Sequence, residues 1–147
     1  MKDKIIELIQ GKRTFEILTH ELPDEDAVGS TSALALALSG LGKKAGRIYT
    51  TAIAEQYIIP PVHKDYLCES PDVSFLLDVS DLEMLGNIQP KGMIAVIDHH
   101  KSNNGYGDIS WVDSKYSSTC EMIYDLLYGF TKMTPAIASN LYMGIFG

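Results

Sequence analysis

The order of the apolar segments along the 147 residues is the feature that most restricts the fold. A short apolar run at 14–19 precedes an Ala/Leu-rich segment at 27–41, which ends at Gly42, and another short run follows at 45–50. This order predicts a β-α-β unit with parallel strands. The same patterns predict strands at 73–77, 93–97 and 109–112 and helices at 2–10, 82–86, 118–129 and 135–145. We therefore expect an open, mostly parallel five-stranded α/β sheet with helices on both faces.

The composition predicts one globular domain over residues 1–147. The chain is 46% apolar, and 12 Lys and Arg against 19 Asp and Glu give it a formal charge of −7. It is too apolar for a disordered chain, and no stretch approaches the roughly 18 apolar residues of a membrane span. Two cysteines are too few for a secreted disulfide framework, and the N-terminus does not resemble a signal peptide, so we expect a soluble, cytoplasmic protein.

Potential metal ligands gather directly after three of the predicted strands. They are His20, Asp24 and Asp26 after the first strand, Asp78 after the third, and Asp98, His99 and His100 after the fourth. The carboxyl ends of parallel strands meet at one edge of a sheet, where ligands bind. Two carboxylates about 4 Å apart repel by about 4 kcal/mol at an effective dielectric constant near 20. A divalent cation removes this penalty, and the mixture of imidazole and carboxylate suits manganese, iron, cobalt or zinc.

Other polar residues in the same regions have simpler interpretations. Asp81, Ser30 and Asp113 each follow the pattern of a helix or turn cap. The Ser118-x-x-Glu121 spacing is that of a capping box ahead of an apolar run. His63 stands in the irregular segment 51–72, and we interpret it as a surface or partly buried side chain rather than a ligand.

The strand-end clusters resemble the motifs of the DHH phosphoesterase superfamily. The matching motifs are His20-x-x-Pro23-Asp24-x-Asp26-Ala27-Val28-Gly29-Ser30, Leu77-Asp78-x-x-Asp81 and Asp98-His99-His100. The likeness continues through Ser117-Ser118-Thr119-Cys120-Glu121 and Leu141-Tyr142-x-Gly144-Ile145. In this respect the chain is similar to the N-terminal, Rossmann-like domain of the oligoribonuclease/pAp-phosphatase (nano-RNase) branch. RecJ-type nucleases generally lack a counterpart of His20.

The resemblance implies a manganese-dependent hydrolase with two metal ions. By this resemblance, the first ion is held by His20, Asp24 and Asp78. The second is held by Asp26, His99 and the bridging Asp78. His100 would contact the substrate phosphate, and Asp98 would orient a ligand histidine. The implied substrates are short oligonucleotides or 3′-phosphoadenosine 5′-phosphate, and a homodimer is implied by the resemblance alone.

The chain also departs from the family pattern. Glu25 stands where the branch commonly has Gly, and the chain stops at Gly147, just before an Asp-Thr that contributes a ligand in the family. From the resemblance we also expect that the smaller C-terminal substrate-binding domain (DHHA1-type) of the family is absent from these residues. We therefore expect these residues to fold and bind at least one metal, but to hydrolyse substrate slowly or not at all. The alternatives are a non-catalytic nucleotide-binding or regulatory module, a manganese-dependent pyrophosphatase, or a cyclic-dinucleotide phosphodiesterase.

Overall fold

The computed structural model describes residues 1–147 and contains a single five-stranded sheet. The strands are β1 (Thr14–Leu18), β2 (Lys44–Ile48), β3 (Val73–Leu77), β4 (Met93–Asp98) and β5 (Ile109–Val112). Their order is β2-β1-β3-β4-β5, and every neighbouring pair is parallel. The chain moves from β1 outward to β2 and returns to the other side of β1 as β3. The order of strands therefore reverses between β1 and β3, where sheets of this kind bind ligands.

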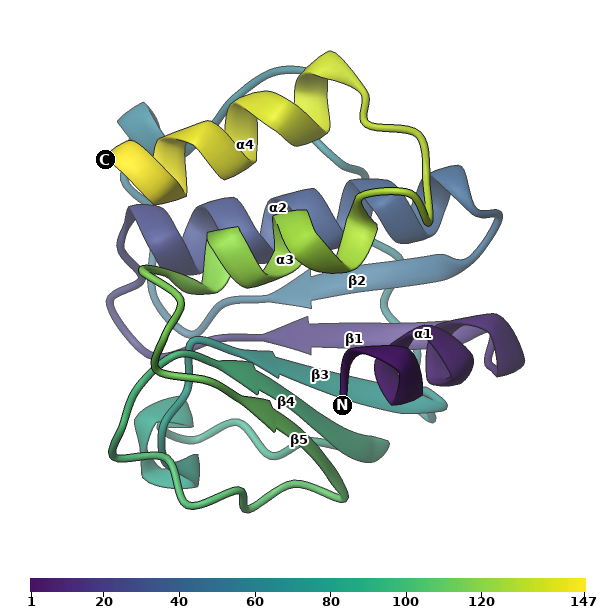
Figure 1. The fold of residues 1–147 in the computed structure, drawn as a ribbon, viewed down its shortest axis with the longest axis vertical. Coiled ribbons are helices and arrows are strands. Elements are labelled where there is room, and N and C mark those ends of the chain that lie inside the picture. Colours follow the sequence, from purple (N-terminus) through teal and green to yellow (C-terminus); the bar gives the residue numbers. More distant parts are fainter.

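Four α-helices stack on one side of the sheet (Figure 1). They are α1 (Lys2–Gly11), α2 (Glu25–Gly40), α3 (Thr119–Leu127) and α4 (Pro135–Phe146). Helices α1, α2 and α3 pack on alternate strand residues in one core, and α4 forms an outer layer above α2 and α3. The other face carries the 3-10 helix η2 (Leu82–Leu85) and loops, around a small second core. The predicted α/β class with an open five-stranded sheet is confirmed, and the sheet is parallel throughout. The expectation of helices on both faces is wrong for the α-helices, because the apolar residues of all four pack in the core on one side of the sheet and the other side carries only η2 and loops.

The predicted elements all occur, with small changes at their ends. The segment at 82–86, predicted as a helix, is the short 3-10 helix η2, and the irregular segment 51–72 contains one 3-10 turn, η1 (Glu55–Tyr57). Helix α2 begins at Glu25, two residues earlier than expected, because the Asp24 side chain accepts a hydrogen bond from the Ala27 N–H at 3.0 Å. No helix combines the length and the apolar character needed to cross a bilayer.

Two glycines allow α2, α3 and α4 to approach closely. A Cβ atom at Gly29 of α2 would lie 2.5 Å from the carbonyl oxygen of Asn140 and 3.0 Å from Cys120 Sγ. A Cβ atom at Gly144 of α4 would overlap the same sulfur. A larger residue at Gly29 would therefore push α4 and α3 away from α2, and one at Gly144 would push α3 away from α4. The close contact sets the first turn of α3 against the first turn of α2.

The segment 51–72 is tied to the outer edge of β2. Arg47 of β2 forms an ion pair with Asp65, with Nε and Oδ1 3.0 Å apart. The His63 Nε2 atom lies 2.8 Å from the carbonyl oxygen of Ala45. His63 is therefore a largely buried residue that anchors this segment, in agreement with its interpretation as a residue outside the metal cluster.

Candidate metal centre

Residues from three strand ends meet around the carboxylate of Asp78, which directly follows β3. Asp78 is only 3% exposed. Its Oδ2 atom lies 3.4 Å from Nε2 of His20, which follows β1, and its Oδ1 atom lies 3.5 Å from Nε2 of His99, which follows β4. The structure thus brings together three residues that are far apart in the sequence. One buried carboxylate faces an imidazole on each side.

The first turn of α2 adds two more carboxylates. Asp24 Oδ1 lies 3.9 Å from His20 Nε2, and Asp26 Oδ2 lies 3.6 Å from His99 Nε2. Two sets of three residues have their ligand atoms within 4.8 Å of one another: His20, Asp24 and Asp78, and Asp78, His99 and His100. Asp26 belongs to neither set, and its position beside His99 relates it to the second one.

The donor atoms fit a divalent transition metal. Two ligand atoms about 2.1 Å from one ion lie about 3 to 4 Å apart, which is the range of the distances around Asp78. The donors are imidazole nitrogens and carboxylate oxygens, a mixture that suits manganese, iron or zinc. His20 Nδ1 lies 2.7 Å from the carbonyl oxygen of Glu21. Because a carbonyl only accepts hydrogen bonds, Nδ1 carries a proton, and Nε2 is the nitrogen that faces the cluster and that a metal ion could bind once the proton on Nε2 is lost.

Asp98 and His100 form a separate pair at the rim of the cluster. Asp98 is fully buried, and its Oδ1 atom accepts a hydrogen bond from His100 Nδ1 at 2.7 Å. Its Oδ2 atom accepts from the side-chain amide of Asn103 at 3.0 Å. Asp98 therefore orients the ring of His100, whereas its contact with His99 is only through the backbone N–H.

The charges in the cluster shift one another's pKa values. The hydrogen bond to Asp78 raises the pKa of His20 to about 9, although burial opposes the shift. Burial and the charge of Asp78 raise the pKa of Asp26 to about 6. Burial also disfavours the charged form of Asp78, but hydrogen bonds from His20 and His99 outweigh it and hold the pKa of Asp78 well below its usual value. Protonated imidazoles balance the carboxylates here, and a divalent cation in their midst would displace those protons.

Two residues at this edge of the sheet have left-handed backbone conformations. They are Asp78, with φ +64°, and Leu22, with φ +53°. No other non-glycine residue has a positive φ. This region disfavours L-residues by about 1–2 kcal/mol, less for Asp, and such residues concentrate at functional sites. At Asp78 the conformation turns the chain as β3 ends.

Two residues that support the cluster were not predicted as members of it. Asn103 fixes Asp98, but an asparagine in a polar loop has the pattern of any turn residue. Thr119 contacts both Asp26 and Asp78, and its sequence signal was the neighbouring capping pattern. Glu25, between the two aspartates, lies against the C-terminal end of α4 near Gly147 and belongs to neither set of ligand atoms.

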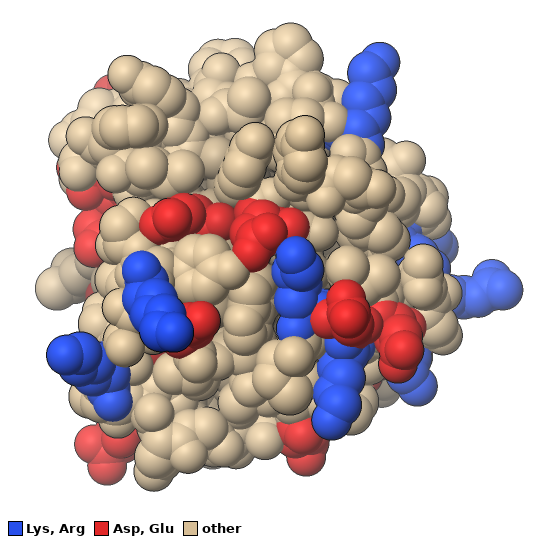
Figure 2. Space-filling view, in the orientation of Figure 1, with Lys and Arg blue, Asp and Glu red and all other residues tan.

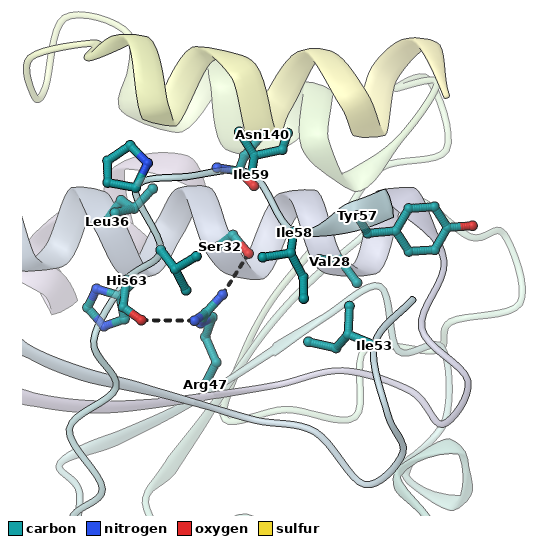
Figure 3. Close-up of a pocket in the computed structure, with 12 residues that line it drawn as sticks. Val28, Ser32, Leu36, Arg47, Ile53, Tyr57, Ile58, Ile59, His63 and Asn140 are labelled. Atoms are coloured by element: carbon teal, nitrogen blue, oxygen red, sulfur yellow. Dashed lines mark hydrogen bonds between the residues drawn. The ribbon is translucent and has the colours of Figure 1, made fainter. Parts of the chain in front are cut away.

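A cavity beside α2 is distinct from the cluster (Figure 3). Its volume is about 90 Å³, well below the roughly 300–1,000 Å³ of typical ligand pockets. Arg47 lies in it and donates hydrogen bonds to Ser32 Oγ at 2.9 Å and to the carbonyl oxygen of His63 at 3.1 Å (Figure 3). Together with the ion pair to Asp65, these bonds occupy the Arg47 guanidinium.

Solved structures and curated sequences resemble this chain over nearly its whole length. A crystal structure of an exopolyphosphatase-related protein from Bacteroides fragilis superposes with a TM-score of 0.88 at 22% identity, covering 98% of this chain and 48% of that one. The bifunctional oligoribonuclease and PAP phosphatase NrnA of Thermus thermophilus is 31% identical over 97% of this chain and 44% of its own length. NrnA of Bacillus subtilis is 29% identical over 100% of this chain and 50% of its own length.

The chain therefore spans about half the length of these relatives. Residues 14–145 match the model of the DHH family, N-terminal domain, and so include every residue of the cluster around Asp78. This match agrees with the fold and with the residues found at the strand ends. The chain belongs to the DHH family and corresponds to its N-terminal domain.

Proposed function

We propose that this chain is the metal-binding lobe of a manganese-dependent phosphoesterase that hydrolyses short oligonucleotides or 3′-phosphoadenosine 5′-phosphate. The observation that carries the proposal is the buried carboxylate of Asp78. Its two oxygens face His20 and His99 at 3.4 and 3.5 Å, from two different strand ends. A carboxylate with an imidazole on each side is suited to bridge two metal ions.

Each carboxylate of the first turn of α2 pairs with one of these imidazoles. Asp24 stands beside His20, and Asp26 stands beside His99. We therefore assign His20, Asp24 and Asp78 to one ion, and Asp26, Asp78 and His99 to the other. Two bound metals lower the pKa of water and neutralise the charge that develops on a transferring phosphoryl group.

His100 is suited to contact the substrate rather than a metal. The nitrogen nearest to Asp78 is Nδ1, at 3.8 Å, and the same nitrogen lies 2.7 Å from Asp98 Oδ1. Because a carboxylate accepts hydrogen bonds, Nδ1 carries the proton and offers no lone pair to a metal. The His100 side chain is 43% exposed, so its Nε2 can meet a phosphate oxygen at the open edge.

The substrate class is proposed from the relatives and from the charge of the chain. Two relatives carry names that describe an oligoribonuclease and a PAP phosphatase, and both substrates present phosphate next to a nucleoside. The formal charge of −7 does not favour binding of long nucleic acids, whose phosphates attract Lys and Arg. A short substrate that binds mainly through a phosphate on the metal ions needs few Lys and Arg contacts, so it is compatible with a negatively charged chain.

The test measures the full-length gene product with a 5′-labelled RNA of two to five nucleotides and with 3′-phosphoadenosine 5′-phosphate. We expect manganese-dependent release of mononucleotide and of inorganic phosphate. The matched control is Asp78→Asn, which keeps the size of the side chain and removes its charge, and it should be inactive on both substrates. Absence of turnover with every divalent metal tested would refute the proposed phosphoesterase activity. Nucleotide binding without turnover would favour the alternative of a non-catalytic nucleotide-binding module.

A further inference from the structure

The first turn of α3 holds two carboxylates of the cluster. The backbone N–H of Thr119 donates to Asp26 Oδ2 at 2.9 Å, and that of Cys120 donates to Asp26 Oδ1 at 2.8 Å. The Thr119 hydroxyl donates to Asp78 Oδ1 at 3.1 Å. Thr119 is fully buried. One residue of α3 is thus bonded both to the carboxylate that follows β3 and to a carboxylate at the start of α2.

The local structure explains why these donors are free to make such bonds. The first N–H groups of a helix have no partner within the helix. Here Ser118 caps α3 by accepting a hydrogen bond from the Glu121 N–H at 3.0 Å, which leaves the N–H groups of Thr119 and Cys120 for Asp26. The positive end of the helix dipole also favours a carboxylate at this position.

The close packing of the helices prevents this turn from moving. Cys120 Sγ fills the space in front of Gly29 of α2 and Gly144 of α4, where not even a Cβ atom would fit without displacing it. The start of α3 therefore has a fixed position relative to Asp26. A hydroxyl held in this way can keep Asp78 in one orientation.

We infer that Thr119 is a positioning residue, whose hydroxyl and backbone N–H together set the separation and orientation of Asp78 and Asp26. This inference rests on the proposed function, because the two carboxylates are useful in that geometry only as ligands of neighbouring metals. Partners that orient metal ligands typically affect metal affinity by 10- to 100-fold. Thr119 would therefore act through Asp78 and Asp26 rather than as a ligand itself.

The test compares variants that differ at the hydroxyl. Thr119→Val keeps the shape and the backbone N–H but removes the donor to Asp78, whereas Thr119→Ser keeps the donor. In calorimetric titrations of the full chain with Mn²⁺, we expect Thr119→Val to bind about 10- to 100-fold more weakly and Thr119→Ser to retain wild-type affinity. In the full-length enzyme, kcat should fall in Thr119→Val while KM changes little.

Ser118→Ala is the matched structural control. It removes the cap of the same helix without touching Asp26 or Asp78 through its side chain, so it should lower thermal stability but not Mn²⁺ affinity. If Thr119→Val does not fold, Thr119→Ala and Thr119→Ser form the deciding pair, because they differ by one oxygen atom. The inference would be overturned if Thr119→Ala and Thr119→Ser bound Mn²⁺ with equal affinity. It would also be overturned if Ser118→Ala lost as much Mn²⁺ affinity as Thr119→Val. If the wild-type chain binds no Mn²⁺, the proposed function itself fails.

Discussion

The two ends of the sheet carry opposite kinds of polar residues. At the carboxyl ends of the strands, two imidazoles and two further carboxylates surround the buried carboxylate of Asp78; they belong to His20, His99, Asp24 and Asp26. At the amino ends, a groove is lined by Lys12, Arg13, Lys43 and Lys44. Figure 2 shows Lys and Arg side chains projecting from the right-hand side of the molecule, which is the side of the amino ends of β1 and β2 in Figure 1.

The difference lies in how the charges are satisfied. At the amino ends, Lys43 donates to the carbonyl oxygens of Gln10 and Lys12 at the end of α1, and Asp72 accepts from the backbone N–H groups of Arg13 and Thr14. Those charges have partners in the chain itself and stabilise helix and strand ends. At the other end the carboxylates also accept hydrogen bonds from the chain, but the buried Asp78 faces the imidazoles of His20 and His99, whose protons a metal ion can replace. A divalent cation from solution can therefore bind at the carboxyl ends of the strands, whereas the amino ends offer it no such site.

The largest effect should come from Asp78. We expect Asp78→Asn to weaken Mn²⁺ binding by more than about 100-fold, since the loss of a mere orienting partner already costs 10- to 100-fold. Asp72→Asn, which makes the same change at the other end of the sheet, should leave binding unchanged. The measurement is the rise in unfolding temperature on addition of Mn²⁺. If Mn²⁺ raised the unfolding temperature equally in Asp78→Asn and Asp72→Asn, the proposed difference between the two ends of the sheet would be wrong.

A smaller effect should come from Asp98. Because it contacts the ring of His100 and none of the carboxylates of the cluster, Asp98→Asn should lower kcat of the full-length enzyme by about 10- to 100-fold and spare Mn²⁺ affinity. Steady-state kinetics and a Mn²⁺ titration of the same preparation separate the two quantities. A loss of Mn²⁺ affinity as large as that of Asp78→Asn would make Asp98 a metal ligand.

The stability of the metal-free protein should depend on pH through His20. Its pKa is about 9 in the folded state, chiefly through Asp78, against about 6.5 when unfolded. The folded state therefore binds the proton more tightly, and this contribution is complete below pH 6.5 and lost as the pH rises to 9.

We expect the free energy of unfolding in urea with a chelator to fall by about 1–2 kcal/mol across this window, after allowance for partial solvent exposure. His20→Asn should flatten the dependence. The raised pKa of Asp26 acts in the same direction at lower pH, between about 4 and 6. A free energy of unfolding that stays constant between pH 6.5 and 9 in the wild type would contradict the pairing of His20 with Asp78.

The smallest effect should come from the backbone strain at Leu22. This side chain is 79% exposed, so Leu22→Gly loses little buried surface and relieves the left-handed conformation. We expect a net stabilisation of about 0.5–1 kcal/mol, the strain relieved minus the greater entropy of an unfolded glycine. Leu67→Gly is the control, because Leu67 is 71% exposed with an ordinary φ and should lose stability. The measurement is thermal unfolding of both variants. Equal losses of stability in Leu22→Gly and Leu67→Gly would show that the backbone of Leu22 is unstrained.

Much of the fold could be predicted because it depends on local patterns. The short apolar strands and the β-α-β order define a parallel sheet, and strand ends in such a sheet converge whatever the details of packing. The residues that follow the strands could therefore be singled out from the sequence. The exact start of α2 could not, because Asp24 serves both as the cap of the helix and as a neighbour of His20.

The supporting contacts could not be predicted because they join segments far apart in the sequence. Thr119 and Asp26 are 93 residues apart, and their contact depends on how closely α3 approaches α2 at Gly29. No local pattern specifies that approach. The partner of Asp98 was likewise expected to be a ligand histidine, and the contact of its side chain is with His100.

The central claim is that the cluster around Asp78 binds divalent cations in place of protons. Titration of the metal-free chain with Mn²⁺ at pH 7.5, repeated in two buffers of different ionisation enthalpy, gives both the number of ions bound and the number of protons released. We predict two ions per chain and net proton release, because His20 is protonated at this pH before the metal enters. Absence of binding, or binding without proton release, would contradict this account.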